Sequence, residues 1–468
     1  AQFPTGQGTS GQALVTDGAG VLSFSDVGTT SDAQSNTVAG TGAGANFSGT
    51  NANNNSLFGK DAGNDITTGD ENTAVGSLAG DAITTGGFNT CIGSIAGTAM
   101  TTATSNVAVG RAALFANVNG GENVAVGIEA LSATSGQYNT AIGSRALDNT
   151  TGVDKLTAVG YKALEDNTSG TTNVAVGAES LKENTTGSAN TAVGTEALEA
   201  NTTGTDNTAV GVRALEANTT ANDNTAVGRS AMFTNTTGAA NTGLGRQALF
   251  SNTTASNNTA VGRSALLSNT TGAENTAVGA NTLDANTTGG ALTAIGRNCL
   301  SANTTGNHNT GVGRECLIEN TTGADNTGMG VECLKENTTA SDNSAFGYFA
   351  LRANTTGTRN SALGKQALEA ATSASDNTAI GNGALRANTT GGNNTALGGT
   401  ALRLNTTGSN NTAVGFEALK ANTNASSNTA VGYQALNANT TAGQNTAVGR
   451  DAMKLNQTAY SCTAVGAG

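Results

Sequence analysis

The chain repeats one sequence motif every 17 residues, and this period limits the possible folds more than any other feature. The motif Asn-Thr-Ala-Val-Gly, or a variant of it, starts at Asn55 and recurs as far as Asn445, with a last copy at Cys462. Every interval is 17 residues except that from Asn123 to Asn139, which is 16. A fixed period of this kind is typical of a solenoid, in which each repeat forms one coil and packs on the next. We therefore expect about 25 stacked coils.

The consensus of the repeat, numbered 1 to 17 from the Asn, is N-T-A-V-G-x-x-A-L-x-x-N-T-T-G-x-x. Thr and Val at positions 2 to 4 favour an extended strand. The segment N-T-T-G at positions 12 to 15 is turn chemistry, because Asn tolerates a left-handed φ and Gly adopts one freely. The run E-A-L-E-A-N-T is compatible with a helix, but about six residues are too few for a stable one. The repeat therefore predicts an all-β coil of strands and turns.

Glycine occupies position 5 in every copy, which indicates a backbone geometry closed to side chains, by a positive φ or by close packing on the next coil. This prediction covers Gly59, Gly76, Gly194, Gly211, Gly228 and Gly381. The apolar residues at positions 4 and 9 predict a core ladder, represented by Val193, Leu198, Val210 and Leu215. Asn at positions 1 and 12 should form ladders whose amides hydrogen-bond along the stack. Charged residues concentrate at positions 6, 7, 10, 16 and 17, which we expect to face solvent.

Positions 9 and 12 change together along the chain. The first three copies combine a Gly at position 9 with a large apolar residue at position 12: Gly63 with Ile66, Gly80 with Ile83, and Gly97 with Met100. Later copies usually have Leu at position 9 and Asn at position 12. We infer that both positions border one interior space, which only one large side chain can fill.

Positions 3 and 4 are both apolar in nearly every copy, as in Ala192 and Val193. Adjacent strand residues point to opposite faces, so one of the two fills the interior of its own coil and the other needs separate cover. A strand buried on both faces is typical of a sheet that packs on further layers. The pattern favours lateral association with identical chains. The alternative is a flat solenoid with one face left bare.

Composition and charge exclude several classes of protein. The 468 residues include 65 Gly, one Pro, no Trp and 3% aromatic residues, which suits thin repeated layers better than one thick core. The net charge is −12, and the 21 Lys and Arg residues form no basic stripe, so we expect no nucleic-acid partner. No apolar stretch approaches the roughly 18 residues that a membrane span requires.

The sequence offers few candidates for chemistry. The only His, His308, occupies position 17, and no Ser-His-Asp or Cys-His pair can be assembled around it. Cys299, Cys316 and Cys333 occupy position 8 of three consecutive repeats, where we expect small buried residues and not metal ligands. We therefore expect no enzyme, no metal site and no cofactor.

Asn-x-Ser/Thr sequons recur nearly once per coil, at position 12. They are either turn chemistry or, in a eukaryotic secretory pathway, acceptors for a ladder of glycans. The candidate acceptors include Asn184, Asn201, Asn218, Asn235 and Asn252.

The repeat resembles the head repeat of trimeric autotransporter adhesins, which carries a similar N-S-x-A-I-G-x-x-A core. It is also similar to the longer NTAVGYQAL…NTTG arrays of phage tail fibres and of surface proteins that end in an autoproteolytic chaperone domain. Residues 428–444, NTAVGYQALNANTTAGQ, are almost the bare consensus. The resemblance covers roughly residues 55–468 and implies a parallel homotrimer of left-handed β-roll coils. Members of these families usually carry a C-terminal anchor or chaperone domain, whereas this chain stops at CTAVGAG, which fits a fragment, a mature product or end-to-end stacking into a filament.

Three regions follow from the sequence. Residues 1–28 include T-D-G-A-G between two apolar runs, which predicts a β-hairpin, and residues 8–28 are similar to short linker elements of phage fibre proteins. Residues 29–54 are rich in Gly, Ser and Asn and should form a linker or cap. Residues 55–468 form the repeat array.

These observations predict an extracellular structural fibre shaft, on a virion or a cell surface, that spaces or presents an attachment function. The alternative is an adhesin head that binds a host glycan or surface protein directly through the variable positions of the coil. Ice binding is a minor alternative, because rows of Thr on a flat solenoid can order ice, but the Thr residues here fall in a turn and at a strand start.

Overall fold

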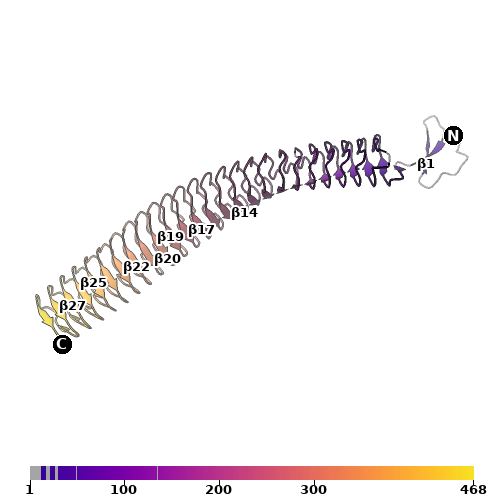
Figure 1. Ribbon diagram of the computed structural model, residues 1–468. Coiled ribbons are helices and arrows are strands. Elements are labelled where there is room, and N and C mark those ends of the chain that lie inside the picture. Colours follow the sequence, from indigo (N-terminus) through magenta and orange to yellow (C-terminus); the bar gives the residue numbers. More distant parts are fainter. Residues whose placement is uncertain (1–11, 17–21, 27–29, 49, 134) are drawn as a thin grey trace. The chain divides into compact units, whose positions relative to one another are not determined.

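The computed structural model describes residues 12–16, 22–26, 30–48, 50–133 and 135–468 (Figure 1). These residues form strands and turns, with no helix in any of the described ranges, so the predicted all-β solenoid is confirmed. The chain divides into two compact units, Ala1–Thr220 and Ala221–Gly468, which are described separately.

The first unit begins with an antiparallel pair of β1 (Gln12–Thr16) and β2 (Leu22–Asp26), as the two apolar runs predict. The turn predicted between them, at 17–21, lies outside the described residues. Next, β3 (Thr30–Ser31) pairs antiparallel with β4 (Thr37–Ala39), and β4 opens a parallel ladder. The ladder continues through β5 (Ser56–Phe58), β6 (Thr73–Val75), β7 (Thr90–Ile92), β8 (Val107–Val109), β9 (Val124–Val126), β10 (Thr140–Ile142), β11 (Thr157–Val159), β12 (Val174–Val176), β13 (Thr191–Val193) and β14 (Thr208–Val210).

The second unit is a parallel ladder throughout, in which equivalent positions of successive coils pair in register, as Thr276 pairs with Thr293. Its strands are β15 (Thr225–Val227), β16 (Thr242–Leu244), β17 (Thr259–Val261), β18 (Thr276–Val278), β19 (Thr293–Ile295), β20 (Thr310–Val312), β21 (Thr327–Met329), β22 (Ser344–Phe346), β23 (Ser361–Leu363), β24 (Thr378–Ile380), β25 (Thr395–Leu397), β26 (Thr412–Val414), β27 (Thr429–Val431), β28 (Thr446–Val448) and β29 (Thr463–Val465).

The parallel ladder begins earlier than the repeat spacing predicts. The side-chain oxygen of Asn36 accepts hydrogen bonds from the backbone N–H of Asn55 (2.8 Å) and from its Nδ2 (3.0 Å), as position 1 does in later coils. Residues 36–40, N-T-V-A-G, are a variant of the motif, but the interval of 19 residues to Asn55 conceals it. Of the two predictions for residues 29–54, a linker or a cap, the linker is excluded for β4, which already pairs with the solenoid ladder.

Each coil has a narrow apolar core made of positions 3, 8 and 9. In the coil that starts at Asn190, Ala192, Ala197 and Leu198 are fully buried, and Leu215 repeats the position of Leu198 one coil later. Burial of a Leu side chain contributes about 2 kcal/mol. The stability of the array thus comes from many small, equivalent layers.

The glycine at position 5 meets both conditions that the sequence predicts. Gly194 has a φ of 136°, and a Cβ atom there would lie 2.6 Å from the carbonyl carbon and oxygen of Gly211. A side chain would therefore be strained by its φ and would also overlap the backbone of the next coil. The prediction is confirmed at all six named positions, which have φ values between 134° and 137°: Gly59, Gly76, Gly194, Gly211, Gly228 and Gly381.

Left-handed φ values fall elsewhere than the turn chemistry predicts. Asn184 and Gly187, at positions 12 and 15, have no positive φ, whereas positions 7, 9 and 17 do, as in Glu196 (57°) and Leu198 (53°). The left-handed φ predicted for the N-T-T-G segment is thus wrong, although the chain does bend there. The left-handed residues turn successive amides up and down the stack: Glu196 donates its N–H to the preceding coil (3.0 Å), and Leu198 donates to the following one (3.0 Å). Each such residue costs about 1 kcal/mol, which the inter-coil hydrogen bond and side-chain burial offset.

Both predicted Asn ladders are present. At position 12, Asn201 Nδ2 donates to Asn184 Oδ1 (2.7 Å) and to the carbonyl oxygen of Gly204 (3.1 Å). At position 1, the Oδ1 of Asn190 accepts from the backbone N–H of Asn207 (3.0 Å). Most of these buried amides hydrogen-bond to the adjacent coil, to a carbonyl of their own coil, or to both, so the polar rows inside the solenoid hold adjacent coils in register.

The inferred competition between positions 9 and 12 is confirmed. A Cβ atom on Gly80 would lie 2.8 Å from Cδ1 of Ile83, and one on Gly63 would lie 2.8 Å from Cδ1 of Ile66. Both separations are too short for a real contact. The coil therefore fills this space from position 12 in the first three copies and from position 9 in most later ones.

Candidate interaction surface

The outward face of the parallel sheet carries an apolar column, formed by position 4 of every coil. Its side chains are partly exposed, for example Phe58 (36%) in the first unit and Leu244 (46%) in the second. In the second unit, the column consists of Val227, Leu244, Val261, Val278, Ile295, Val312, Met329, Phe346, Leu363, Ile380, Leu397, Val414, Val431, Val448 and Val465. We call this row of position-4 side chains the outer column.

Strand alternation explains the outer column. Position 3 points inward and is fully buried, as Ala192 is, so position 4 must point outward. The assignment of Val193 and Val210 to the core of the chain is therefore corrected: each is 36% exposed, whereas Leu198 and Leu215 are core residues. The two valines lie on the second of the two faces that the sequence predicts.

A row of hydroxyl-bearing residues runs beside the outer column. Position 2 is Thr in most coils and shares the outward face with position 4, because the two are separated by one inward residue. Thr276 and Val278, for example, belong to the same three-residue strand β18 and are both partly exposed. The Thr residues at the strand starts thus form a second row on the outward face, parallel to the outer column. This second row is not among the sequence predictions.

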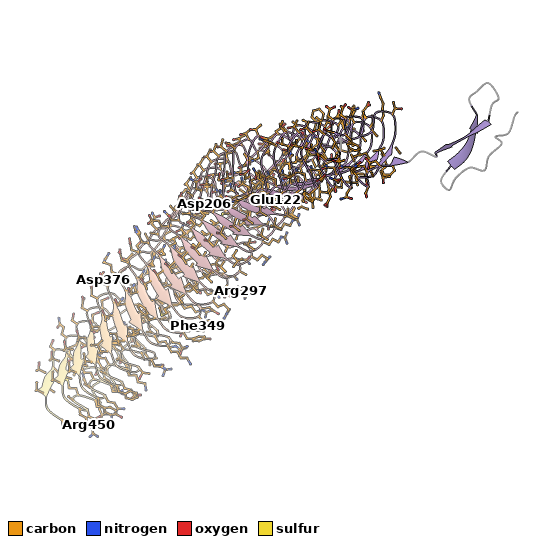
Figure 2. All side chains as sticks on the ribbon, turned by 45° about the vertical axis from the view of Figure 1, so that its right-hand side comes forward. Glu122, Asp206, Arg297, Phe349, Asp376 and Arg450 are labelled. Atoms are coloured by element: carbon orange, nitrogen blue, oxygen red, sulfur yellow. The ribbon has the colours of Figure 1, made fainter. Side chains whose placement is uncertain are left out.

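Two charged columns border this face. In the second unit, every charged residue at position 6 is basic and most of the charged residues at position 17 are acidic. Figure 2 shows Arg297 on one side of the row of strands and Asp376 on the other. In the second unit, the basic edge consists of Arg229, Arg246, Arg263, Arg297, Arg314, Lys365 and Arg450, with no acidic residue at position 6. The acidic edge consists of Asp223, Glu274, Asp325, Asp342 and Asp376, and it also contains His308 and Arg359.

Most ion pairs within the chain lie at positions 7 and 10, away from the outer column. Glu332 is largely buried and is contacted by Arg314 (3.2 Å), Lys335 (3.3 Å) and Arg352 (3.2 Å). Burial opposes its ionisation, but the hydrogen bond and charge of Lys335, together with the two arginines, outweigh burial and lower the pKa of Glu332. This carboxylate ties neighbouring coils together.

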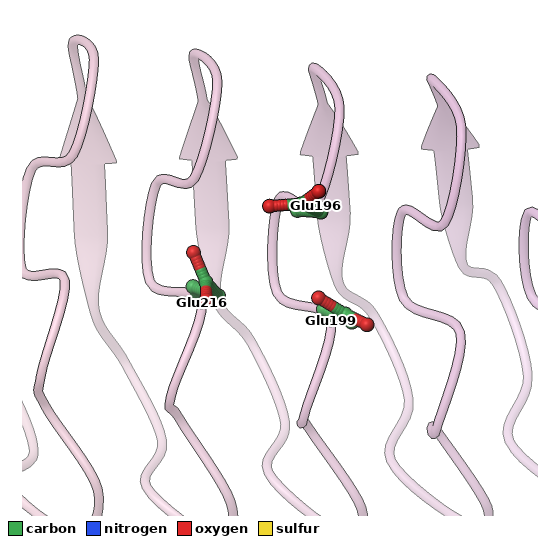
Figure 3. Close-up of side chains that lie close together, drawn as sticks. All are labelled: Glu196, Glu199 and Glu216. Carbon is green, nitrogen blue, oxygen red and sulfur yellow. The ribbon is translucent and has the colours of Figure 1, made fainter.

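Three carboxylates gather in the first unit, where Glu196 and Glu199 belong to one coil and Glu216 to the next (Figure 3). Their oxygens lie within 4.8 Å of one another. Arg213 contacts Glu196 at 3.1 Å, and its Nη2 donates to Glu216 at 2.9 Å. Burial is the main cause that raises the pKa of Glu199, and Lys182 opposes it. The cluster is an ion-pair network whose carboxylates are held by cations of this chain.

The three stacked cysteines are fully buried free thiols, as the sequence predicts for position 8. The hydrogen bond to Cys316 and burial raise the pKa of the Cys299 thiol. A Cβ atom on Gly311 would lie 2.6 Å from Cys299 Sγ, and one on Gly328 would lie 2.6 Å from Cys316 Sγ. The larger cysteine is thus accommodated by Gly at position 3 of the next coil. The sequence contains this signal, because Gly replaces Ala at position 3 of the coil that follows each of these two cysteines.

Two other sequence candidates can now be placed. His308 is exposed and its Nδ1 lies 3.3 Å from Asp325, on the surface as predicted. The sequon asparagines are fully buried within the position-12 ladder, which leaves no room for a glycan on the folded coil; these are Asn184, Asn201, Asn218, Asn235 and Asn252. The glycosylation alternative is therefore contradicted, and the sequons are ladder chemistry.

Comparison with protein-family models and with curated protein sequences finds no match. Among the described residues, no helix has the length and apolarity needed to cross a membrane. The class of protein that the fold defines is a parallel β-solenoid of 17-residue coils with an apolar, charge-bordered outer face.

Proposed function

We propose that this chain is the shaft of an extracellular fibre, on a virion or a cell surface, that spaces or presents an attachment function. The shaft is built from parallel copies of the chain whose outer columns pack together. One observation carries this proposal: the apolar outer column continues through every coil of each unit, and none of the described residues covers it. The resemblance of the repeat to trimeric adhesin heads and phage tail fibres supports three copies and left-handed coils.

The size of the exposed face supports self-association. Each partly exposed position-4 side chain leaves roughly 50 Å² accessible, so the outer column of the second unit exposes on the order of 800 Å² of apolar surface. The largest apolar patch on a typical monomer is about 300–600 Å². A standard interface buries about 800 Å² per partner. The outer column is thus an unusually large patch for an isolated chain and a sufficient one for a stable interface.

A structural role also accounts for the recurring residues of the coil. Gly at position 5 permits the backbone turn, Leu at position 9 fills the core, and Asn at positions 1 and 12 bonds the coils together. Each recurring residue is used in stacking, and the variable residues are spread over the solvent-facing columns. This distribution is that of a spacer whose coils are interchangeable.

The assembly is tested by placing charge on the outer column. Val261→Asp combined with Val278→Asp puts two carboxylates into the proposed interface, whereas Thr271→Asp combined with Thr288→Asp puts the same charge on exposed position-14 residues of the same coils. Light scattering of the full-length protein should show multimers for the wild type and the Thr variant, and monomers for the Val variant. Multimers of all three would refute the interface.

The spacer role is tested by removing whole coils. Deletion of residues 377–410 removes two repeats and preserves the phase of the array. A shaft should keep its assembly and the attachment of the fibre to its target surface, and should only become shorter. Loss of attachment by an intact multimer would show that these coils bind the target themselves.

The exposed aromatic residues favour the second candidate function, an adhesin that binds a host glycan directly. Phe416 and Tyr433, at position 6 of successive coils, are about half exposed and stack with ring centroids 5.8 Å apart. Such rings can pack on a sugar. If this function holds, Phe416→Ala with Tyr433→Ala should abolish binding to host-surface glycans while assembly persists. The shaft proposal expects no change.

Ice binding, the minor alternative, would require the same outer face to be exposed to solvent. The row of Thr and Val side chains is regular, but an outer column buried between copies cannot contact ice. Purified multimers should therefore show no thermal hysteresis, and measurable hysteresis would favour the bare-face alternative.

A further inference from the structure

The two charged edges of the outer face differ in sign, and several of their residues have no ion-pair partner in the described parts of the chain. On the basic edge, Arg229, Arg246 and Arg263 are exposed residues of three successive coils, and among the described residues no carboxylate forms an ion pair with any of them. Their neighbours at position 7 are uncharged: Ser230, Gln247 and Ser264.

The acidic edge has the complementary feature. Asp223, Glu274 and Asp342 are exposed and form no ion pair within the described residues, whereas Asp376 is held by Arg359 at 2.7 Å and Asp325 lies beside His308. The strands and the outer column separate the two edges, as Arg297 and Asp376 illustrate (Figure 2). The unpaired arginines and the unpaired carboxylates of one copy therefore lie on opposite sides of its outer face.

We infer that the arginines at position 6 of one copy bind the carboxylates at position 17 of the next copy, and that these ion pairs fix the copies parallel. The inference rests on the proposed function, because it requires the outer face to be an interface between copies. It goes further by naming the residues that set partner orientation.

Symmetry explains why opposite edges specify a direction. When copies are arranged cyclically with their axes parallel, one edge of each copy meets the other edge of its neighbour, so basic residues face acidic ones. When two copies run antiparallel with their outer faces together, each edge meets the same edge of the partner. The three arginines would then face arginines, which is repulsive.

Cyclic symmetry also places the copies at the same height along the stack. An arginine of one copy can therefore pair only with a carboxylate at a similar level in the next copy. Arg246 and Asp342 have no opposite charge at their level. Asp223 ends the coil before that of Arg229, and Glu274 ends the same coil as Arg263. Both pairs thus fall within one coil spacing, about 4.8 Å. The long, flexible Arg side chain can cover this offset.

A charge-swap experiment on the full-length protein tests the inference. The basic-edge variant combines Arg229→Glu and Arg263→Glu, and the acidic-edge variant combines Asp223→Lys and Glu274→Lys. At low salt, each variant should raise the dissociation constant of the assembly at least tenfold, and a chain carrying all four changes should recover to within about threefold of the wild type. A control with Thr254→Glu and Thr271→Glu, which adds charge at position 14, should have little effect.

Recovery in the four-residue chain is the supporting result. The inference is overturned if the wild type is a multimer but either edge variant assembles as well as the control, or if the four changes together do not recover assembly. If the wild type is a monomer, the proposed function fails first, which is a distinguishable outcome. Because all four residues are exposed, the variants should fold, and hydrogen exchange of the Asn ladders verifies this.

A second readout measures orientation directly. Cys462, near the C-terminal end, is the one cysteine of the five that is not buried. A spin label on Cys462 of the wild-type multimer should show dipolar coupling between copies, because parallel copies place their labels at the same end. An intact multimer without this coupling would contradict the parallel arrangement.

Discussion

Gly398 and Gly399 are adjacent in sequence, but only Gly398 occupies a position that excludes a Cβ atom. Ala substitutions at the two positions therefore test why position 5 is always Gly. Gly398 occupies position 5 with a φ of 140°, and a Cβ atom there would lie 2.5 Å from the carbonyl oxygen of Gly415. Gly399 has no positive φ, and its Cβ would make an ordinary contact at 3.4 Å with the ring of Phe416.

The structure gives the size of each effect. An L-residue at the φ of Gly398 costs about 1–3 kcal/mol in backbone strain. Relief of the overlap requires the coils to separate and weakens inter-coil hydrogen bonds such as Gly415 N–H to Leu397 O (2.8 Å), each contributing about 1 kcal/mol. We expect Gly398→Ala to destabilise its coil by about 3 kcal/mol. Gly399→Ala should stabilise it by about 0.5 kcal/mol, because Ala restricts the unfolded chain.

Native-state hydrogen exchange is the suitable assay, because a repeat array need not unfold as one unit. The amides of the coils around residues 394–415 should exchange about a hundredfold faster in Gly398→Ala and slightly slower in Gly399→Ala. Amides of distant coils report whether the effect is local. Equal and small changes in the two variants would show that position 5 tolerates a side chain, and the explanation of its glycine would fail.

Three further substitutions test the interior of the coil. Ala371 interrupts the position-12 ladder and leaves Oδ1 of Asn354 buried without a partner. Ala371→Asn should therefore raise the free energy of unfolding, measured by denaturant unfolding, by about 1 kcal/mol. An unchanged free energy of unfolding would contradict the stabilising role of the ladder. Gly80→Leu should destabilise the protein by about 1–3 kcal/mol, because the new side chain overlaps Ile83. Adding Ile83→Ala should restore most of the lost stability. A double-mutant cycle without coupling would refute the claim that positions 9 and 12 share one interior space. Glu332→Gln should cost about 1 kcal/mol at pH 7, because the ion pairs lower the folded-state pKa of this carboxyl below its ordinary value of 4.5. This contribution is present above pH 4.5 and is lost as pH falls through the lower folded-state pKa, so the two proteins should converge in stability at strongly acidic pH, and a constant difference would contradict the assignment.

The period and the recurring residues predict much of the fold. The 17-residue interval fixes the coil, the glycine at position 5 predicts a backbone constraint, and the exchange of Gly80 and Ile83 for Leu and Asn predicts a shared interior space. These predictions succeed because the same chemistry recurs in every layer, so one chain supplies many independent examples of each position.

Other features are hidden because they depend on the neighbouring coil and not on residue type. Leu198 and Glu196 have left-handed φ values that neither residue prefers, and only the inter-coil hydrogen bonds explain them. The first coil is missed because it is 19 residues long. The outward direction of Val193 is missed in the core assignment because Ala at position 3 and Val at position 4 are equally apolar in sequence.

The number of chains in the native particle tests the central claim most directly. Native mass spectrometry or sedimentation equilibrium of the purified protein compares the particle mass with the 45.7 kDa of one chain. The account predicts a multimer, with three chains as the number that the repeat resemblance implies, and predicts that Val261→Asp with Val278→Asp reduces it to one chain. A wild-type protein that remains a single chain at all concentrations would contradict the claim that the outer column is an interface.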